Sequence, residues 1–363
     1  VVQKRAAAHT KVGDAVMADQ EPNFKALIAL VADGNSLNVE QARTAFDIMM
    51  SGNATPSQMG AFLMALRVRG ESVNEITGGV MVMRERMRKL NPPSDAMDIV
   101  GTGGDGTGTL NISTAATFVV AGCGVPIAKH GNRAASSKSG TTDVQSALGI
   151  NVDADFSILQ AALDEVGLCF MSAQRHHGAM RNVGPTRIEM GTRTIFNILG
   201  PMSNPAGVKR QLIGVFSRDW IRPMAEALKT LGSEKVWVVH GSDGTDEITS
   251  TGPTYIAALE YGAISEFEIS PDQAGIPVAT LADLKGGEIE ENAAALTALL
   301  NGAPGSYRDV VLFNAAAALM IAGKAADFSN GVELAARSID DGHAKEKLQQ
   351  LIEITNRPAP TVA

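Results

Sequence analysis

A cluster of glycines after a short apolar run constrains the fold of this chain more than any other feature. The run at residues 97–100 is followed by five glycines between residues 101 and 108, and the polar stretch Asn111 to Thr114 then opens another apolar segment. Glycine adopts positive φ angles and leaves no Cβ between the main chain and a ligand. This order predicts a strand, a glycine loop and a helix N-terminus, where free N–H groups and the helix dipole favour a bound phosphate.

A second loop, one strand–helix unit later, carries positive charge. It extends from Lys129 to Gly140, and no acidic residue occurs between Asp105 and Asp143, although the net charge of the chain is −8. Loops at the carboxyl ends of neighbouring parallel strands meet at one crevice. Two anion-binding loops at one crevice suit a ligand with more than one phosphate.

Neither loop has the spacing of a common nucleotide-binding motif. A G-x-x-x-x-G-K-[ST] sequence is missing, which excludes a P-loop. Gly101, Gly103 and Gly106 match G-x-G-x-x-G by letter, but no acidic residue ends the next strand near residues 127–129. Glycine-rich turns also occur for packing alone, and we favour phosphate binding because both loops are rich in hydroxyl and cationic groups.

Composition restricts the class of protein and its partners. The 363 residues suggest two domains or one large one, and an apolar content of 45% is enough for a sizeable core. The scarcity of aromatic residues and the acidic balance argue against nucleic acid as a partner. Cys123 and Cys169 lie in apolar segments and are expected to be reduced. No membrane-spanning helix and no signal peptide are evident, so we expect a cytoplasmic protein.

The periodicity of the chain changes near residue 94. Four helix-start signals precede it, and the fourth helix is expected to end near Leu90. From Met97 onward strands and helices alternate, which predicts a largely parallel sheet, and residues 254–269 are expected to add a strand pair. We expect residues 1–22 to be a disordered N-terminal extension, residues 23–93 to form a helical domain and residues 94–363 to form an α/β domain.

Two further segments carry charged groups suited to binding. Residues 171–188 contain no acid and include Arg187, whose guanidinium can hold a carboxylate bidentately. A solvated basic helix face is the alternative. Asp246 and Glu247 end a loop after a predicted strand, and such a pair can bind magnesium together with substrate phosphates. We expect both of these carboxylates to be exposed.

Four motifs together resemble the anthranilate phosphoribosyltransferase family of tryptophan biosynthesis, and the resemblance extends from about Phe24 to the C-terminus. It implies a nucleoside phosphorylase/phosphoribosyltransferase-like fold, with a small all-helical domain, joined by part of residues 175–207, and a large α/β domain with a mainly parallel sheet. It also implies a homodimer joined through the helical domain, although the Met-rich helix faces there suit a core better. The motifs are Gly101-Thr102-Gly103-Gly104-Asp105, Asn111-x-Ser113-Thr114, Lys129-His130-Gly131-Asn132-Arg133 and the run from Gly191 to Pro201.

The resemblance also implies a reaction and a set of contacts. The phosphoribosyl group of PRPP is transferred to the amine of anthranilate, diphosphate leaves, two magnesium ions assist, and no acid–base residue is required. The expected metal contacts are Ser113, Asp246 and Glu247, and the expected anthranilate contacts are Gly101, Asn132, His177, Arg187 and Gly200. The expected PRPP contacts are Gly101, Gly104, Asp105, Thr109, Asn111, Ile112, Ser113, Thr114, Lys129, His130, Gly131, Asn132, Arg133, Ala134, Ala135, Ser136, Ser137 and Thr141.

Two positions depart from the pattern of this family. Gly178 follows His177 where the family usually has proline, and Thr141 replaces a serine while keeping the hydroxyl. His176 is expected only to pack.

Two other functions are weighed against this one. A pyrimidine nucleoside phosphorylase-like enzyme is disfavoured by the run from Lys129 to Arg133. A non-catalytic nucleotide-binding regulator is disfavoured by Arg187 and the acidic pair, since a binder alone needs no acceptor site.

Overall fold

Helix-start signals at the N-terminal end of the chain lead into helices at the expected places. The computed structural model describes residues 23–132 and 140–358. Capping boxes at Asn38, Thr55 and Ser72 begin the second, third and fourth helices. The bounds are α1 (Phe24–Ala32), α2 (Val39–Met50), α3 (Pro56–Arg69) and α4 (Val73–Arg86).

The fourth helix is shorter than predicted. It ends at Arg86 rather than near Leu90, because the backbone beyond it bonds to other segments. Arg88 N donates to His176 O at 2.8 Å, and Leu90 N donates to Pro205 O at 3.2 Å. These bonds tie together three stretches of chain that connect the helices to the sheet.

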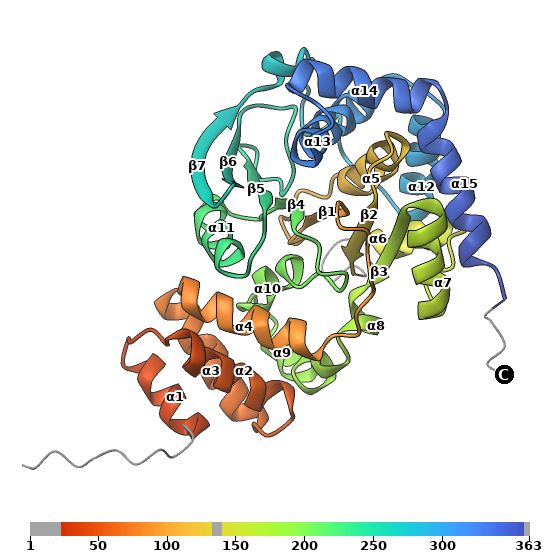
Figure 1. Ribbon diagram of the computed structural model, residues 1–363. Helices are drawn as coiled ribbons and strands as arrows, with labels where there is room; N and C mark the ends of the chain where they lie inside the picture. The colour runs from red at the N-terminus through yellow and green to blue at the C-terminus, as the bar shows by residue number, and fades with distance from the viewer. Residues whose placement is uncertain (1–22, 133–139, 359–363) are drawn as a thin grey trace, which may run out of the picture.

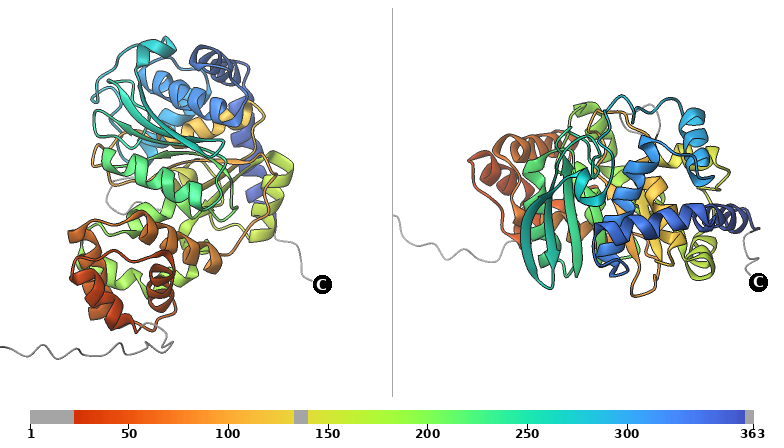
Figure 2. Two further views of the ribbon diagram at one scale, coloured as in Figure 1. Left: turned by 60° about the vertical axis from the view of Figure 1, so that its left-hand side comes forward. Right: turned by 90° about the horizontal axis from the view of Figure 1, so that it is seen from above.

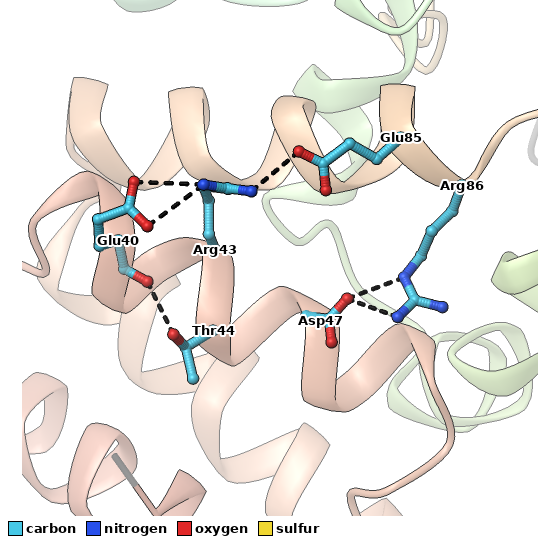
Figure 3. Close-up of polar contacts among 6 residues, drawn as sticks. All are labelled: Glu40, Arg43, Thr44, Asp47, Glu85 and Arg86. Atoms are coloured by element: carbon cyan, nitrogen blue, oxygen red, sulfur yellow. Dashed lines mark hydrogen bonds and ion pairs between the residues drawn. The ribbon is translucent and has the colours of Figure 1, made fainter. Parts of the chain in front are cut away.

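Ion pairs cover the outer side of the α2–α4 contact (Figure 3). Arg43 bonds to Glu40 at 3.2 Å and to Glu85 at 3.0 Å, and Arg86 bonds to Asp47 at 2.5 Å. Each acidic partner is more than half exposed, so these pairs contribute little to stability. The inner sides of the same helices bury Ala42, Ala45, Phe46 and Val80 instead.

In the part of the chain that the structure describes, seven strands form one sheet in the order β3-β2-β1-β4-β5-β6-β7. The first five strands in sequence run parallel, and the last two form an antiparallel pair as predicted. The strand order reverses direction between β1 and β4, which is where open α/β sheets bind ligands. The strands are β1 (Met97–Gly101), β2 (Ile127–Gly131), β3 (Leu168–Ser172), β4 (Arg210–Gly214), β5 (Lys235–Gly241), β6 (Thr254–Glu260) and β7 (Ala263–Ile269).

The sheet separates two hydrophobic cores, since successive side chains of a strand point to opposite faces. Ile99 and Leu212 face a core shared with α5, α13, α14 and α15. Val100 and Ile213 face a core shared with α11 and the N-terminal helices. Figures 1 and 2 show the helices on both sides of the sheet. The helices are α5 (Ile112–Gly122), α6 (Thr141–Ala147), α7 (Phe156–Ala161) with a π-helical turn (Ala162–Val166), α11 (Ile221–Thr230), α12 (Ile289–Leu300), α13 (Ser306–Ala322), α14 (Phe328–Asp340) and α15 (His343–Thr355).

The segment after β3 returns to the N-terminal helices. It contains α8 (Ala173–His176), a 3-10 turn (Gly178–Asn182), α9 (Gly184–Met190) and α10 (Phe196–Met202). Helix α9 contacts α3, and α10 contacts α4. The Phe196 ring meets the Phe46 ring edge-on at 5.6 Å. His176 packs as expected, with its ring 4.8 Å from that of Phe156.

Candidate active site

The acidic loop after β5 lies directly over the carboxyl ends of β1 and β4, at the point where the strand order reverses. A Cβ atom at Gly101 would clash with Asp246 Oδ2, and one at Gly214 would clash with Asp246 O. A side chain at Gly214 has no room because it would meet the backbone of Asp246, whereas one at Gly101 would force the Asp246 carboxylate to move. The two glycines therefore allow the acidic loop to reach the glycine loop.

The acidic pair points into the predicted phosphate site. Gly103 N donates to Asp246 Oδ2 at 2.6 Å, and Ser113 N donates to Glu247 Oε1 at 3.1 Å. The expectation that both carboxylates are exposed was wrong, because each is partly buried against these N–H groups. The acidic pair therefore lies against both the glycine loop and the N-terminus of α5.

Carboxylates crowd together at this point. Asp246 N donates to Asp105 Oδ2 at 3.4 Å. Burial raises the pKa of Asp246, and the nearby Asp105 carboxylate raises it further. Burial likewise raises the pKa of Glu247, with Asp246 adding to the shift and Lys129 opposing it. Desolvated like charges of this kind favour a bound cation.

The donor set fits magnesium. Within residues 23–132 and 140–358, no three His, Cys, Asp or Glu side chains form a metal cluster. Magnesium, however, is commonly held by one or two carboxylates, with water and substrate phosphates completing the shell. Asp246, Glu247 and the hydroxyl of Ser113 supply hard oxygen ligands of the required kind.

Lys129 places its ammonium beneath this cluster. The side chain is only 2% exposed, and Nζ donates to Ile99 O and, at 3.3 Å, to Ser113 Oγ. Burial lowers its pKa, while Asp98, Glu247 and Asp246 raise it. Lys129 therefore balances part of the negative charge of the carboxylates.

Asn314 holds the acidic loop in place from α13. Its Oδ1 accepts from Ile248 N at 3.1 Å, and its Nδ2 donates to Ile248 O at 2.7 Å. An asparagine in an apolar helix was noticeable in the sequence, but only the fold shows which loop it binds.

Two buried imidazoles lie next to the end of α10. The rings of His130 and His177 are 5.1 Å apart, and each residue is 4% exposed. Among the described residues, Nε2 of His130 and both ring nitrogens of His177 have no hydrogen-bond partner. Burial, reinforced by His176, lowers the pKa of His177 to about 4. Burial also lowers the pKa of His130, against a smaller opposing effect of the Gly200 backbone.

Arg187 on α9 is a partly buried cation. Its guanidinium carbon lies 5.3 Å from the centroid of the Phe196 ring, and no ion pair joins it to any carboxylate among the described residues. Burial lowers its pKa. The guanidinium is thus available to an anionic ligand.

Two cations that hold the glycine loop were not predicted. Lys285 Nζ donates to Thr107 O at 2.9 Å, and Arg193 donates to Gly104 O. Arg193 lies within a quoted motif, yet the sequence showed no role for it. Lys285 is far from the loop along the chain and carries no local signal.

The remaining predicted PRPP contacts lie in the glycine loop, at the start of α5, after β2 and at the start of α6. Asp105 accepts from Thr107 Oγ1 at 2.6 Å, and Asn111 O accepts from Tyr307 Oη at 3.1 Å. Thr141 lies beside Gly131, since a Cβ there would be 3.4 Å from Thr141 Cγ2. Gly101, Gly104 and Thr109 lie in the glycine loop, Ile112 and Thr114 in the first turn of α5, and Asn132 just after β2, whereas Arg133, Ala134, Ala135, Ser136 and Ser137 fall outside the described residues.

Sequence comparison assigns the chain to a family. Residues 25–87 match the glycosyl transferase family helical bundle domain, and residues 93–345 match the a/b domain of the same family. Anthranilate phosphoribosyltransferase of Rhodopseudomonas palustris (strain BisB5) is 60% identical over 333 residues, covering 92% of this chain and 98% of that protein. This chain belongs to the anthranilate phosphoribosyltransferase family. The relative from Bradyrhizobium diazoefficiens is 57% identical, over 92% of this chain and 99% of its own length.

Solved structures of anthranilate phosphoribosyltransferases have the same fold. The enzyme from Thermus thermophilus superposes with a TM-score of 0.87 at 39% identity, covering 91% of this chain and 99% of that one. The Saccharomyces cerevisiae enzyme, solved in complex with PRPP and Mg, gives a TM-score of 0.83 at 26% identity, over 92% and 97% of the two chains. The predicted fold class and the predicted family are confirmed.

Proposed function

We propose that this chain transfers the phosphoribosyl group of PRPP to the amine of anthranilate, giving N-(5-phosphoribosyl)anthranilate and diphosphate in tryptophan biosynthesis. One observation carries the proposal: the N–H groups of Gly103 and Ser113 point at the same place as the Asp246 and Glu247 carboxylates. Donors for phosphate oxygens and ligands for a cation are both needed at a departing diphosphate. Arg187, which forms no ion pair with the described residues, suits the acceptor carboxylate.

The chemistry requires positioning and charge stabilisation more than proton transfer. The aniline nitrogen is already a nucleophile, and the ribose gains oxocarbenium character as diphosphate leaves. The N–H groups of the glycine loop and of the start of α5 stabilise charge on the leaving group, and Arg187 orients the acceptor. His130 and His177 stay neutral at pH 7 because burial lowers both pKa values, so they add no positive charge beside the amine.

We propose that two magnesium ions bind at this site. Ser113 would hold one and the acidic pair the other, and bound magnesium neutralises diphosphate oxygens. The remaining proposed contacts are those given by the family resemblance. They are Gly101, Asn132, His177 and Gly200 for anthranilate, and for PRPP the glycine loop with the start of α5 and the segment from Lys129 to Ser137 with Thr141.

We also propose two domains and a homodimer. The packing of α9 on α3 and of α10 on α4 supports a helical domain that takes in part of residues 175–207. Met49, Met50, Met59 and Met83 are buried, as expected of core residues, but Met64 and Val68 on α3 and Ile188 on α9 are 37%, 81% and 83% exposed. Exposed apolar side chains on two helices that contact each other suit a contact between two copies of the chain.

Substituting these exposed side chains tests the proposed dimer directly. Val68→Asp combined with Ile188→Asp should convert a dimer to a monomer, measured by sedimentation velocity. A single species of dimer mass in both proteins would remove this surface as the interface. The free thiols of Cys123 and Cys169 fit the proposed cytoplasmic location. Within the described residues, no helix is long and apolar enough to cross a membrane.

The function is tested by the loss of anthranilate fluorescence in the presence of PRPP and magnesium. Steady loss of fluorescence that stops on chelation supports the transfer. Phosphorolysis of pyrimidine nucleosides without this activity would support the phosphorylase alternative. PRPP binding without turnover of either substrate would support the regulator.

A further inference from the structure

A carboxylate on the interior strand β1 has so far been described only for its effect on the pKa of Lys129. Asp98 is 0% exposed, and its two oxygens accept hydrogen bonds from two different segments. His130 N donates to Oδ1 at 3.1 Å, and Asn204 Nδ2 donates to Oδ2 at 2.7 Å. A buried carboxylate is costly unless it is bonded in this way, so the residue reflects a specific requirement.

Asn204 completes the link between two strands and the end of α10. Its Nδ2 also donates to Ala128 O at 2.8 Å, and its Oδ1 accepts from Ala206 N at 2.8 Å. Gln211 on β4 adds a second tie, since its Nε2 donates to Pro201 O at 3.0 Å. The end of α10 is thus bonded to three neighbouring strands.

The two segments that Asp98 joins are proposed to bind different substrates. His130 is the penultimate residue of β2 and lies at the start of the segment proposed for PRPP, whereas the segment 200–204 contains Gly200 of the proposed anthranilate site. On the basis of the proposed function, we propose that Asp98 and Asn204 are positioning residues, which hold the PRPP loop in register with the acceptor segment. Reacting atoms must approach to about 3–3.5 Å, and a misplacement of about 1 Å can cost roughly 100-fold in rate.

The first test is Asp98→Asn, which keeps the shape of the side chain. Both neighbours of Asp98 are hydrogen-bond donors. A carboxamide has only one oxygen to accept from them, so its NH2 group must face the other donor, and one hydrogen bond is lost. We expect kcat to fall by about 10- to 100-fold. The Kd of PRPP, measured by calorimetry with magnesium and without anthranilate, should change by less than about threefold, because the β2 ladder and the loop's own groups remain.

The second test is Asn204→Ala, which breaks the link from the other side and replaces Asp98→Asn if that variant does not fold. Residues that act as a unit are non-additive. The double variant should therefore lose about as much kcat as the worse single variant. If instead the fold-loss of kcat in the double variant equals the product of the two single fold-losses, the residues act independently and the proposal is overturned.

The matched control is Glu75→Gln. Glu75 is another fully buried carboxylate, and it accepts from Leu37 N at 2.8 Å and from Ser72 N at 2.8 Å within the helical region. This variant should lower Tm without changing kcat per folded molecule. The proposal is overturned if Asp98→Asn behaves like this control, or if its PRPP affinity falls in proportion to kcat. A wild-type protein that forms no phosphoribosylanthranilate would instead refute the proposed function itself.

Discussion

Replacing Arg187 with alanine tests which acceptor the site takes. A hydrogen bond to a charged group contributes about 1.5–3 kcal/mol, which corresponds to roughly 10- to 150-fold in affinity. If Arg187 binds the anthranilate carboxylate in ground and transition states alike, the KM for anthranilate should rise by about that factor while kcat changes less. The KM for PRPP should barely change, because the phosphates are proposed to bind at other loops.

The structure adds an expectation about stability. Arg187 is partly buried and has no carboxylate partner among the described residues. Its removal therefore breaks no ion pair, and Tm should stay close to that of the wild type. Arg187→Lys should recover only part of the loss, since an ammonium cannot bind a carboxylate bidentately.

Steady-state kinetics with each substrate varied in turn give the measurement. Arg86→Ala is the control, because this arginine pairs with Asp47 on the surface at 2.5 Å (Figure 3) and should leave both KM values unchanged. The reasoning is refuted if Arg187→Ala weakens PRPP and anthranilate equally, or if Tm drops sharply. Arg187 would then be a structural residue of the helical region.

Three further predictions concern the metal, the donor substrate and acid stability. Asp246→Asn combined with Glu247→Gln should abolish most turnover while Tm is kept or raised, because the amides relieve the crowding of carboxylates; a normal magnesium titration of activity in this variant would remove the metal role. PRPP with magnesium should stabilise the fold by about 2.7 kcal/mol at 100 times its Kd and anthranilate alone by much less, and a thermal scan without any shift would argue for another ligand. The pKa of His177 is about 4 in the folded chain and about 6.5 when unfolded, so the unfolded chain binds a proton first and stability falls as pH drops from about 6.5 to about 4. His177→Gln should lose less Tm over that window, and equal slopes for the two proteins would contradict the assigned cause.

Short-range signals predicted the parts of the structure that depend on short-range contacts. The capping boxes at Asn38, Thr55 and Ser72 use partners three residues away, so the helices follow from the local sequence. The strand–loop–helix order around residue 101 likewise indicated a parallel sheet with a phosphate site at its edge. The resemblance to the family, rather than any periodicity, suggested the proposed role of Arg187.

Features that depend on tertiary register were not predicted. The bond from Lys285 to Thr107 joins residues 178 positions apart, and the bond from Asn204 to Asp98 joins residues 106 apart. The acidic pair was expected in solvent because a pair of carboxylates in a turn usually lies there. Its inward orientation depends on two glycines that are far from it in sequence: Gly214 leaves room for the backbone of Asp246, and Gly101 leaves room for its carboxylate.

The contacts of the acidic pair imply that the chain fills its own anion site when no substrate is bound. The N–H groups of Gly103 and Ser113 already have anionic acceptors, the carboxylates of Asp246 and Glu247. A phosphate reaching these donors must exchange with a carboxylate, since two anions repel each other at one N–H group. If PRPP binds at these donors as proposed, its binding is a displacement of the two carboxylates. If magnesium binds these carboxylates, the exchange becomes easier, so we expect free PRPP to bind more weakly than its magnesium complex.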